Sequence, residues 1–193
     1  ALLNANVAPE QFDWDSFESG LDADARKEKN DLEEIYKGSL NDLSETDVII
    51  IGGGQAALST AYFLKRKKIP FIILDDQTQA GGAWQHAWES LRLFSPNTWS
   101  SLSGWMMPTT EQTYPARNEV IEYLSAYEQR YQFPIIRPVH VDRVESTEGY
   151  LDVYAGDKYW RAKAVVSATG TWSQPYIPHY DGHEGFEGVQ LHR

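Results

Sequence analysis

The sequence predicts an α/β fold built around a parallel β-sheet. Residues 47–51 and 71–75 form short, continuous apolar runs rich in β-branched side chains, as expected for strands buried on both faces. Between these runs, residues 58–68 carry apolar side chains at helical spacing after three consecutive glycines. A strand, a turn, a helix and a second strand in this order form a unit whose two strands lie parallel.

The glycine run has the Gly-x-Gly-x-x-Ala pattern of a dinucleotide-binding turn. Gly52 allows a tight turn, Gly54 lets a pyrophosphate approach the backbone, and Ala57 keeps the helix close to the strand. We expect Gln55 to contact the same cofactor, whose phosphates would lie at the positive end of the helix. Asp75 ends the second strand and would accept hydrogen bonds from a ribose. The pattern therefore predicts dinucleotide binding at this turn.

Periodicity predicts the elements that follow. Residues 118–131 carry an apolar helical face, and this face comprises Val120, Leu124, Tyr127 and Tyr131. Residues 139–145, 150–156 and 158–162 alternate apolar and polar side chains, which predicts a small antiparallel β layer. Residues 164–167 form one more apolar strand.

Composition excludes several classes of protein. The chain has 193 residues and a net charge of −11, which excludes a basic nucleic-acid-binding domain. Cysteine is absent, which excludes disulfides and thiolate metal sites. No apolar run reaches the roughly 20 residues that a membrane span needs. We expect a cytoplasmic protein that acts on a small molecule and contacts neither nucleic acid nor membrane.

The charge divides the chain into two parts. Residues 1–47 hold 13 acids and 4 bases, whereas residues 48–193 hold 15 acids and 13 bases. We predict an acidic leader over residues 1–46, with one helix over residues 22–37, and a cofactor-binding domain over residues 47–193. The leader is either a solvated acidic segment or a linear motif that binds a basic partner.

The leader resembles that of the Bacteroidetes small-subunit ribosomal protein that is built of OB-type RNA-binding repeats. The resemblance covers residues 11–47 and rests on FDWDSFESG and DLEEIYKGSLNDLSETDV. It implies docking on the small ribosomal subunit through residues 11–38. No OB repeat follows, so RNA binding is not expected.

Five short motifs follow the dinucleotide turn. They are Gly81-Gly82-Ala83-Trp84, Leu91-Arg92-Leu93-Phe94-Ser95-Pro96, Tyr114-Pro115-Ala116-Arg117, Ala168-Thr169-Gly170, and the set Phe186, Gly188 and His192. With the turn itself, the chain from residue 47 to residue 192 resembles the class B flavin-dependent monooxygenases, which are NAD(P)H-dependent FAD oxidoreductases.

This resemblance implies a Rossmann-like FAD-binding domain. Beyond the first turn, the FAD contacts that it implies are Gly82, Trp84, Arg92, Val141, Thr169 and Gly170. Asn97 stands near the place where some members have an asparagine beside the flavin, which makes it the candidate catalytic residue. In the family, NADPH or NADH reduces FAD, and a flavin C4a-peroxide then transfers oxygen to a nucleophilic or carbonyl substrate.

The 193 residues hold one glycine fingerprint, whereas the family uses a second one for NADPH. We therefore expect a portion that binds FAD weakly and is not catalytically competent alone. Two alternatives stay open: a ribosome-associated interaction protein, or an artificial joining of two unrelated stretches. His179 and His183 lie among glycine and proline residues rather than on a helix, so we expect no metal site.

Overall fold

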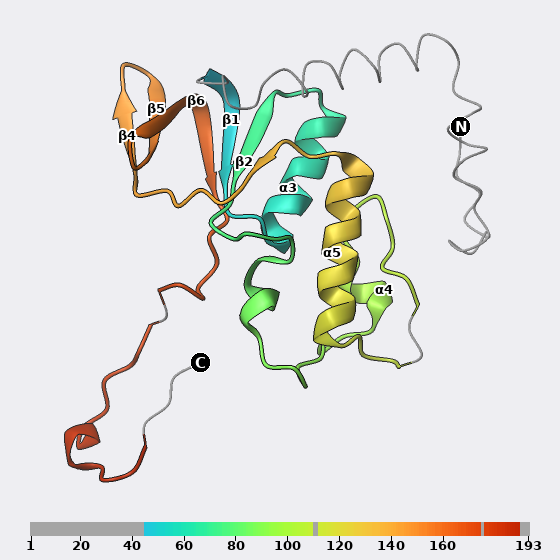
Figure 1. Cartoon of the computed structure of the whole chain (residues 1–193), viewed down its shortest axis with the longest axis vertical. Coiled ribbons are helices and arrows are strands. Elements are labelled where there is room, and N and C mark those ends of the chain that lie inside the picture. Colours follow the sequence, from blue (N-terminus) through green and yellow to red (C-terminus); the bar gives the residue numbers. More distant parts are fainter. Residues whose placement is uncertain (1–44, 110–111, 175, 190–193) are drawn as a thin grey trace.

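The computed structural model describes residues 45–109, 112–174 and 176–189, and its centre is one six-stranded sheet (Figure 1). The strands follow the order β3-β2-β1-β6-β5-β4. Their bounds are β1 Glu45–Ile51, β2 Phe71–Leu74, β3 Ile135–Ile136, β4 Arg143–Thr147, β5 Tyr150–Ala155 and β6 Lys158–Ser167. The helices are α3 Gln55–Arg66, α4 Asn97–Ser100 and α5 Arg117–Tyr131, with 3-10 turns η2 Gly82–His86 and η3 His183–Gly185.

The parallel half of the sheet confirms the predicted fold class. β1 lies between β2 and β6 and runs parallel to both, with Ile50 opposite Ile73 on one side and Val166 on the other. Ile49 and Ile50 point to opposite faces, and both are fully buried. Burial on both faces explains why these strands read as continuous apolar runs.

The antiparallel half differs from the prediction in one respect. Residues 158–162 and 164–167, expected as two strands, form the single strand β6. This strand pairs antiparallel with β5 through Ala162 and parallel with β1 as far as Ser167, so its two edges serve both halves of the sheet. β4 begins at Arg143 rather than Val139, because Val139 instead donates its backbone N–H to the Asp75 carbonyl. β3 was not predicted, since two residues carry no readable pattern.

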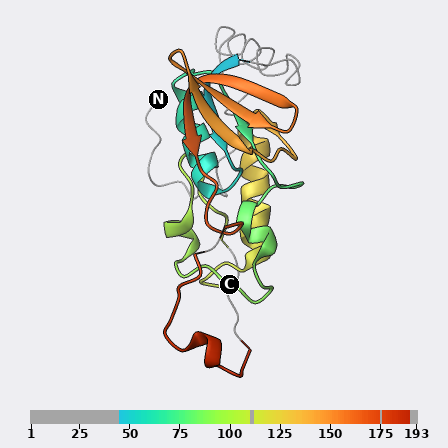
Figure 2. The same cartoon turned by 90° about the vertical axis from the view of Figure 1, so that its left-hand side faces the viewer.

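Two apolar cores lie on opposite faces of the sheet. On one face, α3 and α5 pack over β1 and β2 through Leu58, Leu124 and Tyr127. On the other face, Ile49 and Ile72 pack against Val153, Trp160 and Ala162 of the antiparallel strands. The antiparallel strands therefore bend toward the face of β1 and β2 that lies opposite the helices, and their side chains cover it (Figures 1 and 2).

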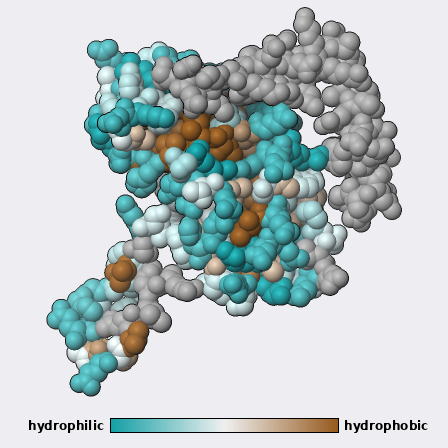
Figure 3. All heavy atoms as spheres, in the orientation of Figure 1, coloured by the Kyte–Doolittle hydropathy of each residue, from teal (hydrophilic) through white to brown (hydrophobic). Residues whose placement is uncertain are grey.

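Past Trp172, whose ring stacks on that of His86 with the centroids 5.7 Å apart, residues 173–174 and 176–189 run away from the body as an extended arm (Figures 1 and 2). Apolar side chains lie scattered on this arm (Figure 3), and Ile177 and Val189 are exposed. Among the described residues, no helix has both the length and the apolar composition to cross a bilayer.

Trp160 is the largest side chain that the antiparallel strands contribute to the second core, with an exposed fraction of 6%. We expect Trp160→Ala to lower the free energy of unfolding by about 4 kcal/mol, because it leaves a cavity between the two halves of the sheet. The neighbouring Tyr159 is 52% exposed and serves as a control, whose change to alanine should cost about 1 kcal/mol. Urea unfolding measures both; equal losses would contradict this view of the sheet.

Candidate functional site

The candidate site lies where the carboxyl ends of β1, β2 and β6 meet the start of α3 (Figure 1). Gly52 begins the turn with φ +102°, and its N–H donates to the Leu74 carbonyl over 2.7 Å. A Cβ at Gly52 would lie 2.5 Å from the carbonyl oxygen of Ala168, the residue that follows β6. Only glycine therefore fits between β1 and the end of β6.

Gly54 is the N-cap residue of α3 and has no side-chain hydrogen bond to cap the helix. A Cβ on Gly54 would have no heavy atom within 4 Å, so this side of the turn is open. Ala57 is fully buried one turn later, where it packs between the helix and the sheet. An uncapped N-terminus with open space beside its glycine is the geometry at which helices bind phosphate groups, and we call this start of α3 the cradle.

A second glycine turn packs against the first. Gly81 and Gly82 have φ +113° and +52°, and a Cβ on Gly82 would lie 2.8 Å from the Cα of Gly54. A hydrogen bond also joins the two turns, because the indole N–H of Trp84 donates to Gln55 Oε1 over 3.3 Å. The two turns thus bring together four predicted cofactor residues, which are Gly54, Gln55, Gly82 and Trp84.

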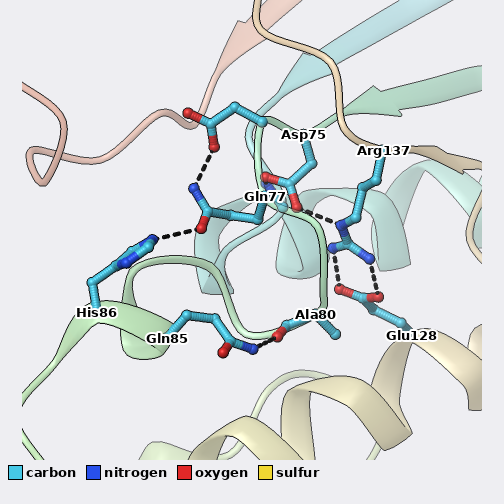
Figure 4. A network of polar contacts seen from close by, with 9 residues as sticks. Asp75, Gln77, Ala80, Gln85, His86, Glu128 and Arg137 are labelled. Carbon is cyan, nitrogen blue, oxygen red and sulfur yellow. Dashed lines mark hydrogen bonds and ion pairs between the residues drawn. The ribbon is translucent and has the colours of Figure 1, made fainter.

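Arg117 holds this second turn in place, a role that the sequence did not reveal. Its Nε donates to the Trp84 carbonyl over 2.9 Å and its Nη2 to the Gln85 carbonyl over 2.6 Å. The side chain of Gln85 in turn donates to the Ala80 carbonyl (Figure 4). Arg117 is the first residue of α5, so its hydrogen bonds join the start of this helix to the second glycine turn.

Asp75 lies at the end of β2 with an exposed fraction of 2%. Its Oδ1 accepts the N–H of Gly53 over 3.0 Å, and its Oδ2 accepts the Arg137 Nε over 2.5 Å (Figure 4). Both carboxylate oxygens therefore bind groups of the protein itself. A ribose contact by Asp75 stays a prediction, which requires the remaining lone pairs of the same oxygens.

Arg137 and Glu128 complete the polar part of the site and were not predicted. Two guanidinium nitrogens of Arg137 donate to the two Glu128 oxygens, each over 2.7 Å. Burial lowers the pKa of Arg137, but its hydrogen bonds to Glu128 and Asp75 outweigh that effect and raise it. A basic residue directly after the apolar pair Ile135–Ile136 was the only available signal in the sequence.

The remaining predicted FAD contacts lie around the same end of the sheet or flank it. Thr169 and Gly170 follow β6 and are exposed, and the Thr169 Cα lies beside Gly52. Val141 is partly buried against the second core. Arg92 is exposed and donates to the Tyr114 carbonyl over 3.1 Å. Their contacts with a cofactor stay predictions.

Asn97 is the first residue of α4, and its side-chain amide donates hydrogen bonds to the loop that follows. Its Nδ2 lies 3.2 Å from the Met107 carbonyl and 3.3 Å from the Pro108 carbonyl. These contacts hold the loop in place, and the catalytic role of Asn97 stays a prediction.

Several predictions fall on other parts of the chain. The leader, including the proposed docking segment 11–38, and His192 lie outside the described residues. Phe186 and Gly188 lie on the extended arm. The rings of His179 and His183 meet edge to face at 4.4 Å, and within the described ranges no three His, Cys, Asp or Glu side chains gather as for a metal ion.

Residues 49–192 match the pyridine nucleotide-disulphide oxidoreductase family. The chain belongs to this family. The glycine turn, β2 and α5 all lie inside the matched region, so the site described above belongs to the family's fold. The predicted resemblance to NAD(P)H-dependent flavoprotein oxidoreductases is confirmed at this level.

Solved and curated relatives agree with the family. A flavin-containing monooxygenase from Stenotrophomonas maltophilia is 52% identical with a TM-score of 0.73, and the match covers 76% of this chain and 44% of that one. The uncharacterized oxidoreductase CzcO of Bacillus velezensis is 35% identical over 68% of this chain and 38% of its own. The probable indole-3-pyruvate monooxygenase YUCCA7 of Arabidopsis thaliana is 28% identical over 75% of this chain and 36% of its own. The chain thus spans less than half the length of these relatives.

Gly52 and Gly54 differ in what surrounds them, and this difference predicts different effects of alanine. Gly52→Ala should lower the free energy of unfolding by about 3 kcal/mol, because it adds a Cβ against the Ala168 carbonyl at a φ that disfavours side chains. Gly54→Ala meets no neighbouring atom and should cost less than about 1 kcal/mol. Denaturant unfolding without cofactor compares them. A Gly52→Ala chain as stable as the wild type would contradict the described turn.

Proposed function

We propose that this chain is the FAD-binding portion of a flavin-dependent NAD(P)H oxidoreductase of the monooxygenase type. The observation that carries the proposal is the cradle at the uncapped start of α3, where Gly54 leaves open space beside the helix N-terminus. The cradle lies at the carboxyl ends of parallel strands, the usual position of a dinucleotide in this type of sheet. The 52% identity to a flavin-containing monooxygenase supports FAD as the dinucleotide.

The residues fit the cofactor by their chemistry. The backbone N–H groups at the start of α3 would bind the pyrophosphate, since they combine free donors with the positive end of the helix dipole. The second glycine turn, held by Arg117, would place Gly82 and Trp84 along the cofactor. A bound flavin would supply the redox chemistry of the whole protein, that is, hydride acceptance from NADPH or NADH and the reaction with oxygen.

The substrate belongs to the whole protein rather than to this portion. We infer that the substrate is a small molecule, because the relative YUCCA7 carries the name of a probable indole-3-pyruvate monooxygenase. A cytoplasmic location is part of the proposal. Docking of residues 11–38 on the small ribosomal subunit is not, because that segment lies outside both the described residues and the family match.

Gly54→Ala tests the cradle directly. The added methyl group occupies the space through which a pyrophosphate would approach, so we expect the affinity for FAD to fall about tenfold or more. Flavin fluorescence titration measures the affinity, and unfolding without FAD shows that the variant remains folded. If the wild-type chain binds no FAD, the proposal fails; if Gly54→Ala binds FAD as tightly as the wild type, the pyrophosphate lies elsewhere.

The 193-residue chain should not sustain NADPH oxidation even with FAD added. Its sequence holds one glycine fingerprint, and a hydride donor needs a second binding site to hold it against the flavin. Absorbance at the NADPH band follows the reaction, with free FAD as the control. Steady NADPH oxidation above that control would contradict the assignment of this chain as the FAD-binding portion alone.

A further inference from the structure

Two carboxyl side chains and a guanidinium from three different parts of the fold meet beside the glycine turn. Asp75 directly follows β2, Glu128 lies on α5 and Arg137 follows β3 (Figure 4). Their side chains have exposed fractions of 2%, 10% and 15%. Arg137 lies between the two carboxylates, with its Nε on Asp75 and its Nη1 and Nη2 on Glu128.

Gly53 connects this cluster to the cradle. Its N–H donates to Asp75 Oδ1 over 3.0 Å, in the residue position directly before Gly54. A Cβ on Gly53 would collide with the Asp75 carboxylate and lie 2.7 Å from Arg137 Nη2. The turn, the carboxylate and the guanidinium are therefore in direct contact, and a shift of one must move the others.

The charges explain why the arginine matters for an anionic ligand. With Arg137 present, the cluster carries one net negative charge; without it, two buried carboxylates would lie beside the place where a pyrophosphate binds. Such repulsion acts strongly in a site of low dielectric constant. A buried ion pair adds little stability compared with apolar packing, so stability alone does not account for this arrangement.

We propose that Arg137, clamped by Glu128, is a positioning residue for the dinucleotide cradle. Arg137 orients the Asp75 carboxylate, which fixes the Gly53 N–H and thereby sets the turn before the cofactor arrives. This inference rests on the proposed function, since it concerns the same site. Arg137 and Glu128 need not touch the cofactor in this arrangement.

The test uses the full 193-residue chain and three ligands, FAD, ADP and FMN. ADP carries the ribose and pyrophosphate without a flavin, whereas FMN has no pyrophosphate. The variants are Arg137→Gln, Arg137→Lys and Glu128→Gln. The matched control is Arg161→Gln, because Arg161 pairs in the same way with buried Asp152, over 2.7 and 2.9 Å, within the antiparallel strands. Calorimetric titration gives the affinities, and thermal unfolding without ligand gives the stabilities.

We expect Arg137→Gln to lower the affinities for ADP and FAD about tenfold or more. Glu128→Gln should lower them less. Arg137→Lys should lower them less than Arg137→Gln, since a lysine keeps the charge but lacks the planar guanidinium that donates to both carboxylates. FMN affinity should not change. Arg161→Gln should lose stability without losing ADP affinity.

The outcomes separate this inference from the proposed function. A wild-type chain that binds neither FAD nor ADP overturns both. A wild-type chain that binds them, with Arg137→Gln and Glu128→Gln binding equally well, overturns the positioning role alone. A fall in ADP affinity of the same size in Arg161→Gln also overturns it, because the effect would then follow from general destabilisation. If Arg137→Gln does not fold, Arg137→Lys and Glu128→Gln decide by the same criteria.

Discussion

The chain is packed so closely at the carboxyl end of the sheet that three glycines have no room for a Cβ, two of them against backbone and one against side chains. Gly52 lies against Ala168, Gly53 against the Asp75 carboxylate, and Gly82 against Gly54. Each contact joins the β1–α3 turn to a different part of the chain. The positions of β2, β6 and η2 around the candidate site all depend on these contacts, because a single methyl group at any of them would force the segments apart.

The buried polar side chains of the candidate site are paired with one another, so they fit into this close packing. Asp75 and Glu128 would each be costly to bury as separate charges, but one guanidinium neutralises part of that charge and satisfies their oxygens. The same group links β2 and α5, and Arg117 links the start of α5 to η2. α5 is thereby joined to both glycine turns, through Glu128 and Arg137 to the first and through Arg117 to the second.

Local patterns predicted most of the fold. The β-branched runs of β1 and β2 and the helical spacing in α3 and α5 are signals contained within about fifteen residues. Prediction was weaker where an element is short or serves two partners: β3 has two residues, and β6 combines two expected strands because both of its edges are paired. The glycines of the turn could be predicted from their spacing, whereas the roles of Arg117 and Arg137 could not, since both follow from contacts across the fold.

Asp75 shows most clearly which properties of the site follow from the sequence and which follow from the tertiary structure. Its place after an apolar run and a glycine turn marked it from the sequence as part of a dinucleotide site, because strand ends and turn glycines are local properties of the chain. Its partner Arg137 is 62 residues away, and Glu128 lies on a different element. Which donors reach a buried carboxylate depends on how β2, β3 and α5 pack, and no spacing along the chain encodes that distance. Residue order thus predicted most of the elements and marked the candidate site, while packing decided which side chains hold that site.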